Sequence, residues 1–464
     1  MAVFQKVLDD KIVGASATTA PTGFTSVVDF PTLVQNARTA NLPLFLRPGI
    51  YPSLAIDVLT SNGGGNPLYL TAGSQTATIQ LSGTVGHLLK VDSVPNVILE
   101  NIVFDGNGLT PTDNAGLLFF NNAGAANFEV RNCTIKNTKV AGIYSYLASG
   151  TIKNSTITSC DSAVTGSDSV LRIENNTISS CSNNGIFIQT STVKGNGSWI
   201  NRNKINSIDN LLGGTGPYGN GILVFRAGNV KIAENHINTT KYSGIRLNGA
   251  GNCHVANNYI VNARETALYL EAPGVGINLT GGVVSGNIID GGTTGISVAN
   301  SGQFGDGTAR KVTVIGNQIS NITFTFIPEE NANGPAAGII AEGSCNIVGN
   351  SIENCAGLGM NVGTGAIGYD LLVSGNFVHT CPLGIGYGRG GTGTVIVGNT
   401  ISVYKTAAGP SDSNYLYSGA IVSTGFDGVH FTREVISGAA NTDYGNAPQT
   451  SVGNLTVGMN RAHI

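Results

Sequence analysis

Apolar and polar residues alternate with a period of two in short stretches along most of this chain. One recurring phrase consists of an apolar residue, a spacer, glycine or asparagine, asparagine, a second spacer and a final apolar residue. Such alternation is typical of strands that bury one face, and asparagine or glycine between strands favours tight turns. The phrase occurs as IENNTI (173–178), INRNKI (200–205), IAENHI (232–237), VANNYI (255–260), VSGNII (284–289), VIGNQI (314–319), IVGNSI (347–352), VSGNFV (373–378) and IVGNTI (396–401).

A second phrase follows the first and begins with Gly-Ile, as in GIFIQ (185–189) and GIRLN (244–248). It also alternates, so each repeat contains two or three short strands. Many such repeats in succession predict an all-β parallel solenoid, in which each coil stacks on the previous one at about 4.8 Å. Equivalent residues of successive repeats then form columns along the body.

The asparagine two positions before the final apolar residue forms one such column. Its side-chain amides are expected to hydrogen-bond from coil to coil inside the turns. The predicted ladder consists of Asn176, Asn203, Asn235, Asn258, Asn287, Asn317, Asn350, Asn376 and Asn399.

Four of the seven cysteines fall in another column, whose other members are small or apolar. We interpret these four as core packing residues. The alternative is a disulfide between the neighbours Cys160 and Cys181. The odd number of cysteines and the lack of a Cys-x-x-Cys spacing give no support to a disulfide framework or a zinc site. The column contains Cys160, Cys181, Cys355 and Cys381.

The two ends of the chain differ from the repeats. Apolar residues at helical spacing over 29–40 predict a short helix with Asp29 as its N-cap, which would cover the open end of the core. The stretch PLFLRPGIY (43–51) is predicted to be the first strand. These patterns divide the chain into an N-terminal arm (1–28), one solenoid domain with its N-terminal cap (29–404) and C-terminal closing coils (405–464).

The low charge content of the chain limits the kinds of binding partner that are expected. Only 11% of the residues are charged, the net charge is −3, and no basic run is present, so no nucleic-acid partner is expected. No apolar run reaches the roughly 18–20 residues that span a membrane, so no membrane partner is expected. The start lacks the apolar core of a signal peptide, because Asp9, Asp10 and Lys11 interrupt it. Acidic residues are scattered, and neither a metal nor another cofactor is predicted.

The Gly-Ile strands identify which side chains share one outer face. Because isoleucine and the later apolar residue point inward, the residues between and after them point outward. One end of this face is aromatic and its middle is ionisable. The first outward column is Tyr144, Thr165, Phe187, Leu223, Arg246, Tyr269, Ser297, Ile340, Asn361 and Gly386; the second is Tyr146, Ser167, Gln189, Phe225, Asn248, Glu271, Ala299, Glu342, Gly363 and Gly388.

The segments GNGILVFRAGNVKIAENHI (219–237), RETALYLE (264–271) and VVSGNIIDGGTTGISVAN (283–300) give the chain a family resemblance. It resembles the twin-arginine-translocated β-helix repeat proteins, a group within the pectate-lyase-like superfamily. The resemblance implies a right-handed parallel β-helix, carbohydrate chemistry, and a periplasmic or secreted location. No signal peptide is present in this sequence, so a cytoplasmic location stays open. A monomer and a homotrimer are both compatible with such a helix.

The first functional hypothesis is a polysaccharide lyase or uronate epimerase. Both remove a proton beside a carboxylate, and therefore need a cation to neutralise that carboxylate and a nearby acid or base. Arg246 is the candidate cation, with Arg264 or Lys241 in support. Tyr269 is the candidate acid or base, because the adjacent Arg246 is expected to lower its pKa.

The second hypothesis is a glycoside hydrolase or glycosyl-transferring enzyme. Glu271 and Glu342 share one column two coil steps apart, or roughly 10 Å, which is near the upper limit for an inverting pair. Glu265 is another candidate partner.

The third hypothesis is a non-catalytic glycan-binding or structural solenoid, in which Arg246 and Glu271 form an ordinary surface ion pair worth ~0–1 kcal/mol. In every case the expected partner is a poly- or oligosaccharide. The candidate binding residues are Tyr144, Tyr146, Phe187, Gln189, Phe225, Asn248, Lys241, Tyr242 and Arg264.

Overall fold

The computed structural model describes residues 29–59, 66–73, 77–111, 116–121, 127–213, 216–271, 281–299, 311–328, 332–363, 370–387, 394–403, 419–423, 429–432 and 435–438. The chain divides into two compact units. The N-terminal unit contains residues up to 191 together with 196–208, and the C-terminal unit contains 192–195 and the residues from 209 onward.

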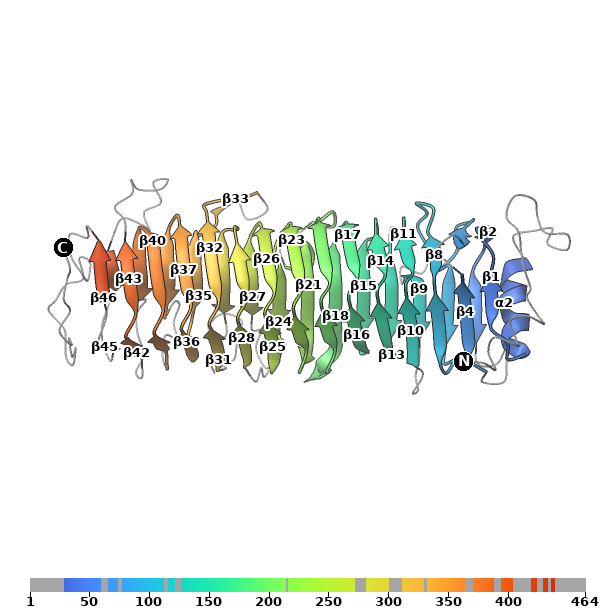
Figure 1. The fold of residues 1–464 in the computed structure, drawn as a ribbon, viewed down its shortest axis with the longest axis horizontal. Helices are drawn as coiled ribbons and strands as arrows, with labels where there is room; N and C mark the ends of the chain where they lie inside the picture. Colours follow the sequence, from blue (N-terminus) through green and yellow to red (C-terminus); the bar gives the residue numbers. More distant parts are fainter. Residues whose placement is uncertain are drawn as a thin grey trace. The chain divides into compact units, whose positions relative to one another are not determined.

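The N-terminal unit begins with the helix α2 (Asp29–Thr39) and continues as coils of three strands, each strand pairing in parallel with its equivalent in the next coil (Figure 1). Its sheet A contains β1 (Leu44–Leu46), β4 (Leu68–Ala72), β7 (Val97–Glu100), β10 (Asn127–Arg131), β13 (Ser149–Lys153), β16 (Val170–Glu174) and β19 (Trp199–Asn201). Its sheet B contains β2 (Gly49–Ser53), β5 (Ala77–Leu81), β8 (Ile102–Asp105), β11 (Thr134–Lys136), β14 (Thr156–Thr158), β17 (Thr177–Cys181) and β20 (Lys204–Ile208). Its sheet C contains β3 (Ile56–Leu59), β6 (Leu89–Asp92), β9 (Gly116–Asn121), β12 (Ala141–Tyr146), β15 (Ser162–Ser167) and β18 (Asn184–Gly195).

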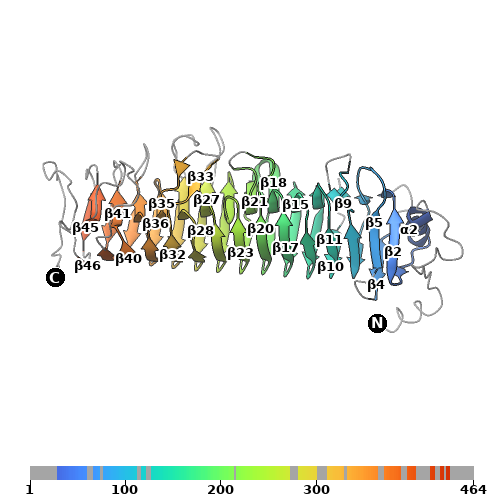
Figure 2. The ribbon, with the colours of Figure 1, turned by 90° about the horizontal axis from the view of Figure 1, so that it is seen from above.

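The C-terminal unit repeats the same three-strand coil, as a quarter turn of the view also shows (Figure 2). Its sheet A contains β22 (Lys231–Ala233), β25 (Cys253–Ala256), β28 (Gly282–Ser285), β31 (Val312–Ile315), β36 (Cys345–Val348), β39 (Leu372–Ser374), β42 (Thr394–Val397) and β45 (Val429–Thr432). Its sheet B contains β23 (His236–Thr240), β26 (Tyr259–Ala263), β29 (Ile288–Asp290), β32 (Gln318–Ile322), β37 (Ser351–Cys355), β40 (Phe377–Cys381), β43 (Thr400–Val403) and β46 (Val435–Gly438). Its sheet C contains β21 (Asn220–Gly228), β24 (Ile245–Asn248), β27 (Thr266–Glu271), β30 (Thr294–Ala299), β35 (Ala337–Ala341), β38 (Leu358–Val362), β41 (Leu383–Tyr387) and β44 (Gly419–Ser423). A short antiparallel hairpin, β33 (Phe326–Ile327) and β34 (Ala332–Asn333), interrupts the coils.

The predicted helix is confirmed, and α2 packs against the first coil, where the rings of Phe30 and Tyr51 lie 5.4 Å apart. The prediction of a single strand over 43–51 is wrong. The stretch contains β1 and β2, which belong to different sheets, and the chain turns between them at Arg47 and Pro48. Proline has no N–H to donate to a sheet, so it fits this corner.

The turn between sheets A and B fixes the coil geometry. The residue before each ladder asparagine has a positive φ, for example 54° at Asn257 and 62° at Gly286. Glycine and asparagine adopt this conformation most readily, and they occupy the position in every coil of the ladder except at Arg202 and Glu234. The ladder asparagine itself is buried. Asn287 Oδ1 accepts from the backbone N and the side-chain Nδ2 of Asn258 at 3.0 and 2.9 Å, and Asn287 Nδ2 donates to Asn317 Oδ1 at 2.9 Å.

The amide ladder predicted from the sequence is therefore confirmed within each unit. It links Asn176 to Asn203 in the N-terminal unit, and it runs through Asn235, Asn258, Asn287, Asn317, Asn350, Asn376 and Asn399 in the C-terminal unit.

The cysteines are free and buried at all seven positions, which confirms the core-packing interpretation. The alternative Cys160–Cys181 disulfide is not formed. The division into an arm, one solenoid domain and closing coils stays a prediction, and much of 405–464 lies outside the described residues. Among the helices of the described residues, none has the length and apolar content needed to cross a membrane.

Replacing Asn287 by alanine is expected to lower the free energy of unfolding by about 2 kcal/mol or more, because two buried donors of Asn258 lose their acceptor and each such loss costs about 1–3 kcal/mol. Chemical denaturation would measure the effect. The control Asn346→Ala removes an amide from the outer side of β36. This surface substitution should cost less than about 0.5 kcal/mol. Equal effects of the two substitutions would contradict the ladder's role.

Candidate functional site

The outer face of sheet C in the C-terminal unit brings the predicted ionisable residues together. In the register of β24 and β27, Arg246 lies opposite Tyr269 and Asn248 lies opposite Glu271. β27 pairs in parallel with β30, so that Tyr269 lies opposite Ser297 in the first column. The predicted columns are thus confirmed on this face, because the alternation of the strands and the ladder turns fix the same register.

Glu271 is held by three hydrogen bonds on a single oxygen. Arg246 donates to Glu271 Oε2 from Nε at 3.0 Å and from Nη2 at 2.6 Å, and Asn248 Nδ2 donates to the same oxygen at 2.6 Å. Both charged side chains are 9% exposed. The description of this pair as an ordinary surface ion pair is therefore wrong, because both partners have lost most of their contact with water. Within the described part of the chain, Glu271 Oε1 accepts no hydrogen bond.

A loop before β21 covers the guanidinium. A Cβ added at Gly216 would lie 3.0 Å from Arg246 Nη2 and 3.1 Å from Nη1, and the φ of Gly216 is 113°. The loop is held in place by Asn220, which is buried and donates from Nδ2 to the carbonyl oxygen of Gly216 at 2.9 Å. The segment 216–220, leading into β21, therefore forms a wall over this part of sheet C.

Tyr269 is half-buried, and the guanidinium carbon of Arg246 lies 4.9 Å from the centre of its ring. Burial raises the pKa of Tyr269 well above its ordinary value, the negative charge of Glu271 raises it further, and the opposing effect of Arg246 is smaller. Glu265 and Glu342 also raise this pKa. The prediction that Arg246 lowers the pKa of Tyr269 is therefore wrong for the net effect. Tyr269 is a neutral phenol at neutral pH.

Tyr242 has a place different from the one predicted. It is completely buried, and a Cβ at Gly219 would lie 2.6 Å from its ring. The guanidinium carbon of Arg264 lies 5.6 Å from the centre of the same ring. Direct contact of Tyr242 with a ligand is therefore excluded in this conformation, because the loop ending at Gly219 packs on it. Tyr242 supports the wall, and half-buried Arg264 lies at its edge.

The remaining predicted residues of this unit lie around the same face. Lys241 Nζ is 3.7 Å from Asp209 Oδ1, and both side chains are substantially exposed. Glu342 follows β35, and its backbone N donates to the carbonyl oxygen of Val298 at 3.0 Å. Phe225 is half-buried on β21, with the guanidinium carbon of Arg226 4.6 Å from its ring centre.

The other predicted aromatic binding residues, Tyr144, Tyr146 and Phe187, belong to the N-terminal unit. On its sheet C, Tyr144 and Phe187 lie in one column on either side of Thr165, and Tyr146 and Gln189 lie in the next column on either side of Ser167.

Sequence reasoning missed three members of the first column, Asp57, Lys90 and Phe119. Phe119 pairs with Tyr144 at a ring separation of 5.3 Å, and Lys90 Nζ lies 5.8 Å from the Phe119 ring. All three lie in strands that lack the Gly-Ile opening. The alternating GLLFFN (116–121) was the available signal for Phe119.

Comparisons with known proteins agree on the fold. The family described as "Right handed beta helix region" matches residues 141–319. A PL6 alginate lyase, solved in complex with a trisaccharide, has a TM-score of 0.53 and 12% identity over 82% of this chain and 86% of its own. The N-terminal fragment of bacteriophage Phi29 gene product 12 has a TM-score of 0.53 and 14% identity over 89% of this chain and 69% of its own.

The A-module of the Azotobacter vinelandii mannuronan C-5 epimerase AlgE6 has a TM-score of 0.47 and 17% identity, over 68% of this chain and 93% of its own. No curated protein sequence is significantly similar to the chain. The chain therefore has the fold of a right-handed parallel β-helix, as the resemblance implied.

Glu271→Ala is expected to destabilise the C-terminal unit by about 3–5 kcal/mol, because the buried guanidinium of Arg246 loses the carboxylate that balances its charge. The double variant Arg246→Met/Glu271→Leu should recover most of this loss. Thermal and urea unfolding would measure both variants. The exposed pair of Arg172 and Glu174 is the control. Glu174→Ala should cost less than about 1 kcal/mol. A cost for Glu271→Ala no larger than the control would contradict the burial of the pair.

Proposed function

We propose that this chain is an enzyme that acts on an acidic polysaccharide, by lyase or epimerase chemistry, on the outer face of sheet C in the C-terminal unit. The observation that carries the proposal is the neutral, half-buried phenol of Tyr269 beside the Arg246–Glu271 pair. Among the described residues, the Tyr269 hydroxyl has no hydrogen-bond partner. A fold shared with a protein described as an alginate lyase gives further support.

The chemistry begins at the carbon beside the carboxylate of a uronate unit. A base removes the C5 proton, and the electron pair is stabilised on the substrate carboxylate if a cation or hydrogen-bond donors face it. In a lyase, this pair then forms the C4–C5 double bond while the bond from C4 to the bridging oxygen breaks, and an acid protonates that oxygen. In an epimerase, an acid instead returns a proton to C5 from the opposite face.

Tyr269 is the proposed acid in either route, because its raised pKa keeps its proton in place until the substrate gains negative charge. Arg246 Nη1 is the proposed donor to the substrate carboxylate. Glu271 holds Nε and Nη2, and so orients the guanidinium while leaving Nη1 without a hydrogen bond within the described residues. Because Glu271 offsets part of the charge of Arg246, Arg264 and Lys241 are proposed as additional cations. Glu342 is the proposed base.

The hydrogen bonds to Glu271 argue against a hydrolase that uses it as the acid. Arg246 and Asn248 place three donors on Oε2, so this oxygen already has its partners and is not presented to a leaving group, as the acid of a hydrolase must be. Hydrolysis and binding without catalysis would therefore each contradict the proposal in the activity test below.

Tyr269→Phe keeps the ring against Arg246 and removes only the hydroxyl, so kcat should fall by about 10²–10⁴-fold with KM little changed. Ultraviolet absorbance of an unsaturated product reports a lyase, and NMR of C5 configuration reports an epimerase. Tyr259→Phe, on the exposed side of β26, is the matched control and should retain full activity. An unchanged kcat for Tyr269→Phe, new reducing ends without unsaturation, or binding without turnover would each contradict the proposal.

The pH profile provides a separate prediction. A free tyrosine titrates near pH 10, and the pKa of Tyr269 is raised above that value, so the acid stays protonated throughout the neutral and mildly alkaline range. The alkaline limb of kcat should therefore lie above about pH 10. A loss of activity centred between about pH 7 and 8 would identify a histidine or another group as the acid, and would remove Tyr269 from that role.

A further inference from the structure

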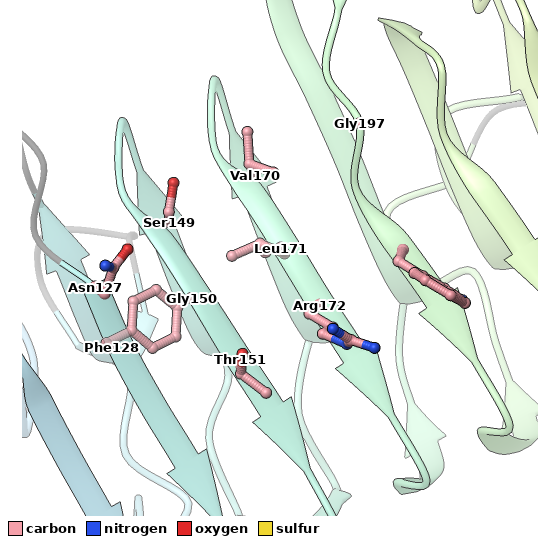
Figure 3. Close-up of a pocket in the computed structure, with 10 residues that line it drawn as sticks. Asn127, Phe128, Ser149, Gly150, Thr151, Val170, Leu171, Arg172 and Gly197 are labelled. Atoms are coloured by element: carbon pink, nitrogen blue, oxygen red, sulfur yellow. The ribbon is translucent and has the colours of Figure 1, made fainter.

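A hollow lies on sheet A of the N-terminal unit, far in sequence from Tyr269 and on a different sheet. It has a volume of about 330 Å³ and is open to the outer face of β10, β13, β16 and β19 (Figure 3). Gly150 leaves room for the neighbouring ring of Phe128, because a Cβ there would overlap that ring. The lining residues are Asn127, Phe128, Ser149, Gly150, Thr151, Val170, Leu171, Arg172, Gly197 and Trp199.

Trp199 is the only tryptophan in the chain, and it is 38% exposed at the rim of this hollow. The guanidinium carbon of Arg172 lies 4.9 Å from its ring centre. A flat aromatic ring combines a large apolar face with low conformational freedom, which makes it a platform for the C–H face of a sugar ring. Packing against Arg172 fixes the orientation of the platform.

Charge at the hollow favours an anionic sugar. Arg172 is the one charged residue among those that line it, and its side chain is 55% exposed. Its Nε binds Glu174, while its two terminal nitrogens make no hydrogen bond within the described residues. Such a guanidinium can hold a carboxylate with two parallel hydrogen bonds. Ser149, Thr151 and Asn127 add polar groups suited to sugar hydroxyls.

We propose that this hollow is a saccharide-binding site for a uronate unit, with the sugar ring on Trp199 and its carboxylate on the terminal nitrogens of Arg172. The site uses none of the residues proposed for proton transfer. It holds a chain of the polymer on sheet A and thereby raises its residence time on the protein. The choice of a uronate rests on the substrate class of the proposed function, whereas the platform itself rests on the hollow.

The single tryptophan allows a direct test. Titrating the full chain with tetramannuronate should give a saturable change in tryptophan fluorescence, and the neutral cellotetraose should give a change at least about tenfold weaker in affinity. Arg172→Gln should weaken the uronate about tenfold or more, because a hydrogen-bonded charge pair is lost. Lys204→Gln is the matched control, since it removes an exposed cation from sheet B of the same unit, and it should leave the affinity unchanged.

Trp199→Ala should abolish binding of the uronate at this hollow, and calorimetry would measure the loss. Because Trp199 lies at the surface, the variant is expected to fold. No fluorescence response to either saccharide, or an unchanged uronate affinity in Arg172→Gln, would overturn the proposal, and equal affinity for both saccharides would overturn the assignment of a uronate.

Tyr269→Phe separates the two proposals. It should lose turnover and keep the fluorescence titration. Turnover by the wild-type chain without a fluorescence response would remove the sheet A site and leave the proposed function standing. A fluorescence response without any turnover would remove the proposed function and leave the sheet A site standing.

Discussion

The buried amide ladder between sheets A and B is the constraint on which the other features depend. In the C-terminal unit, each ladder asparagine from Asn258 to Asn376 accepts from the coil before it and donates to the coil after it. A shift of one residue would therefore leave several buried donors and acceptors without partners. Because strand side chains alternate with a period of two, the same shift would also turn the core face outward. The ladder therefore fixes which outer side chains become neighbours, and the candidate site follows from that register.

Charge is scarce in this chain, and the structure shows what its concentration on sheet C requires. Arg246 and Glu271 lose water beneath the loop that contains Gly216, and they compensate each other, while Asn248 adds a hydrogen bond to Glu271. The pair in turn creates the environment of Tyr269, where burial and neighbouring carboxylates outweigh the nearby guanidinium. A neutral phenol beside an oriented cation is the combination on which the proposed chemistry relies.

The sequence predicts the features that recur in every coil. It does not predict features that depend on how one loop packs, or on the burial of a side chain by residues distant in sequence. Asn287 and the pairing of Arg246 with Tyr269 follow from a repeated phrase and a period of two. The cover over Arg246 and the packing on Tyr242 depend on how the segment around Gly216 and Gly219 folds back, which no periodicity encodes. The raised pKa of Tyr269 depends on burial and on carboxylates that include Glu342 from another coil. Trp199 lies on sheet A, whereas the Gly-Ile strands predict outward columns on sheet C alone.

A crystal structure of the Tyr269→Phe variant with a bound acidic oligosaccharide tests the central claim most directly. The account predicts that a sugar carboxylate lies within hydrogen-bond distance of Arg246 Nη1, that C5 of the same unit faces the former position of the Tyr269 hydroxyl, and that Glu271 still holds Nε and Nη2. A saccharide bound elsewhere, with its carboxylate out of hydrogen-bond reach of Arg246 Nη1, would contradict it.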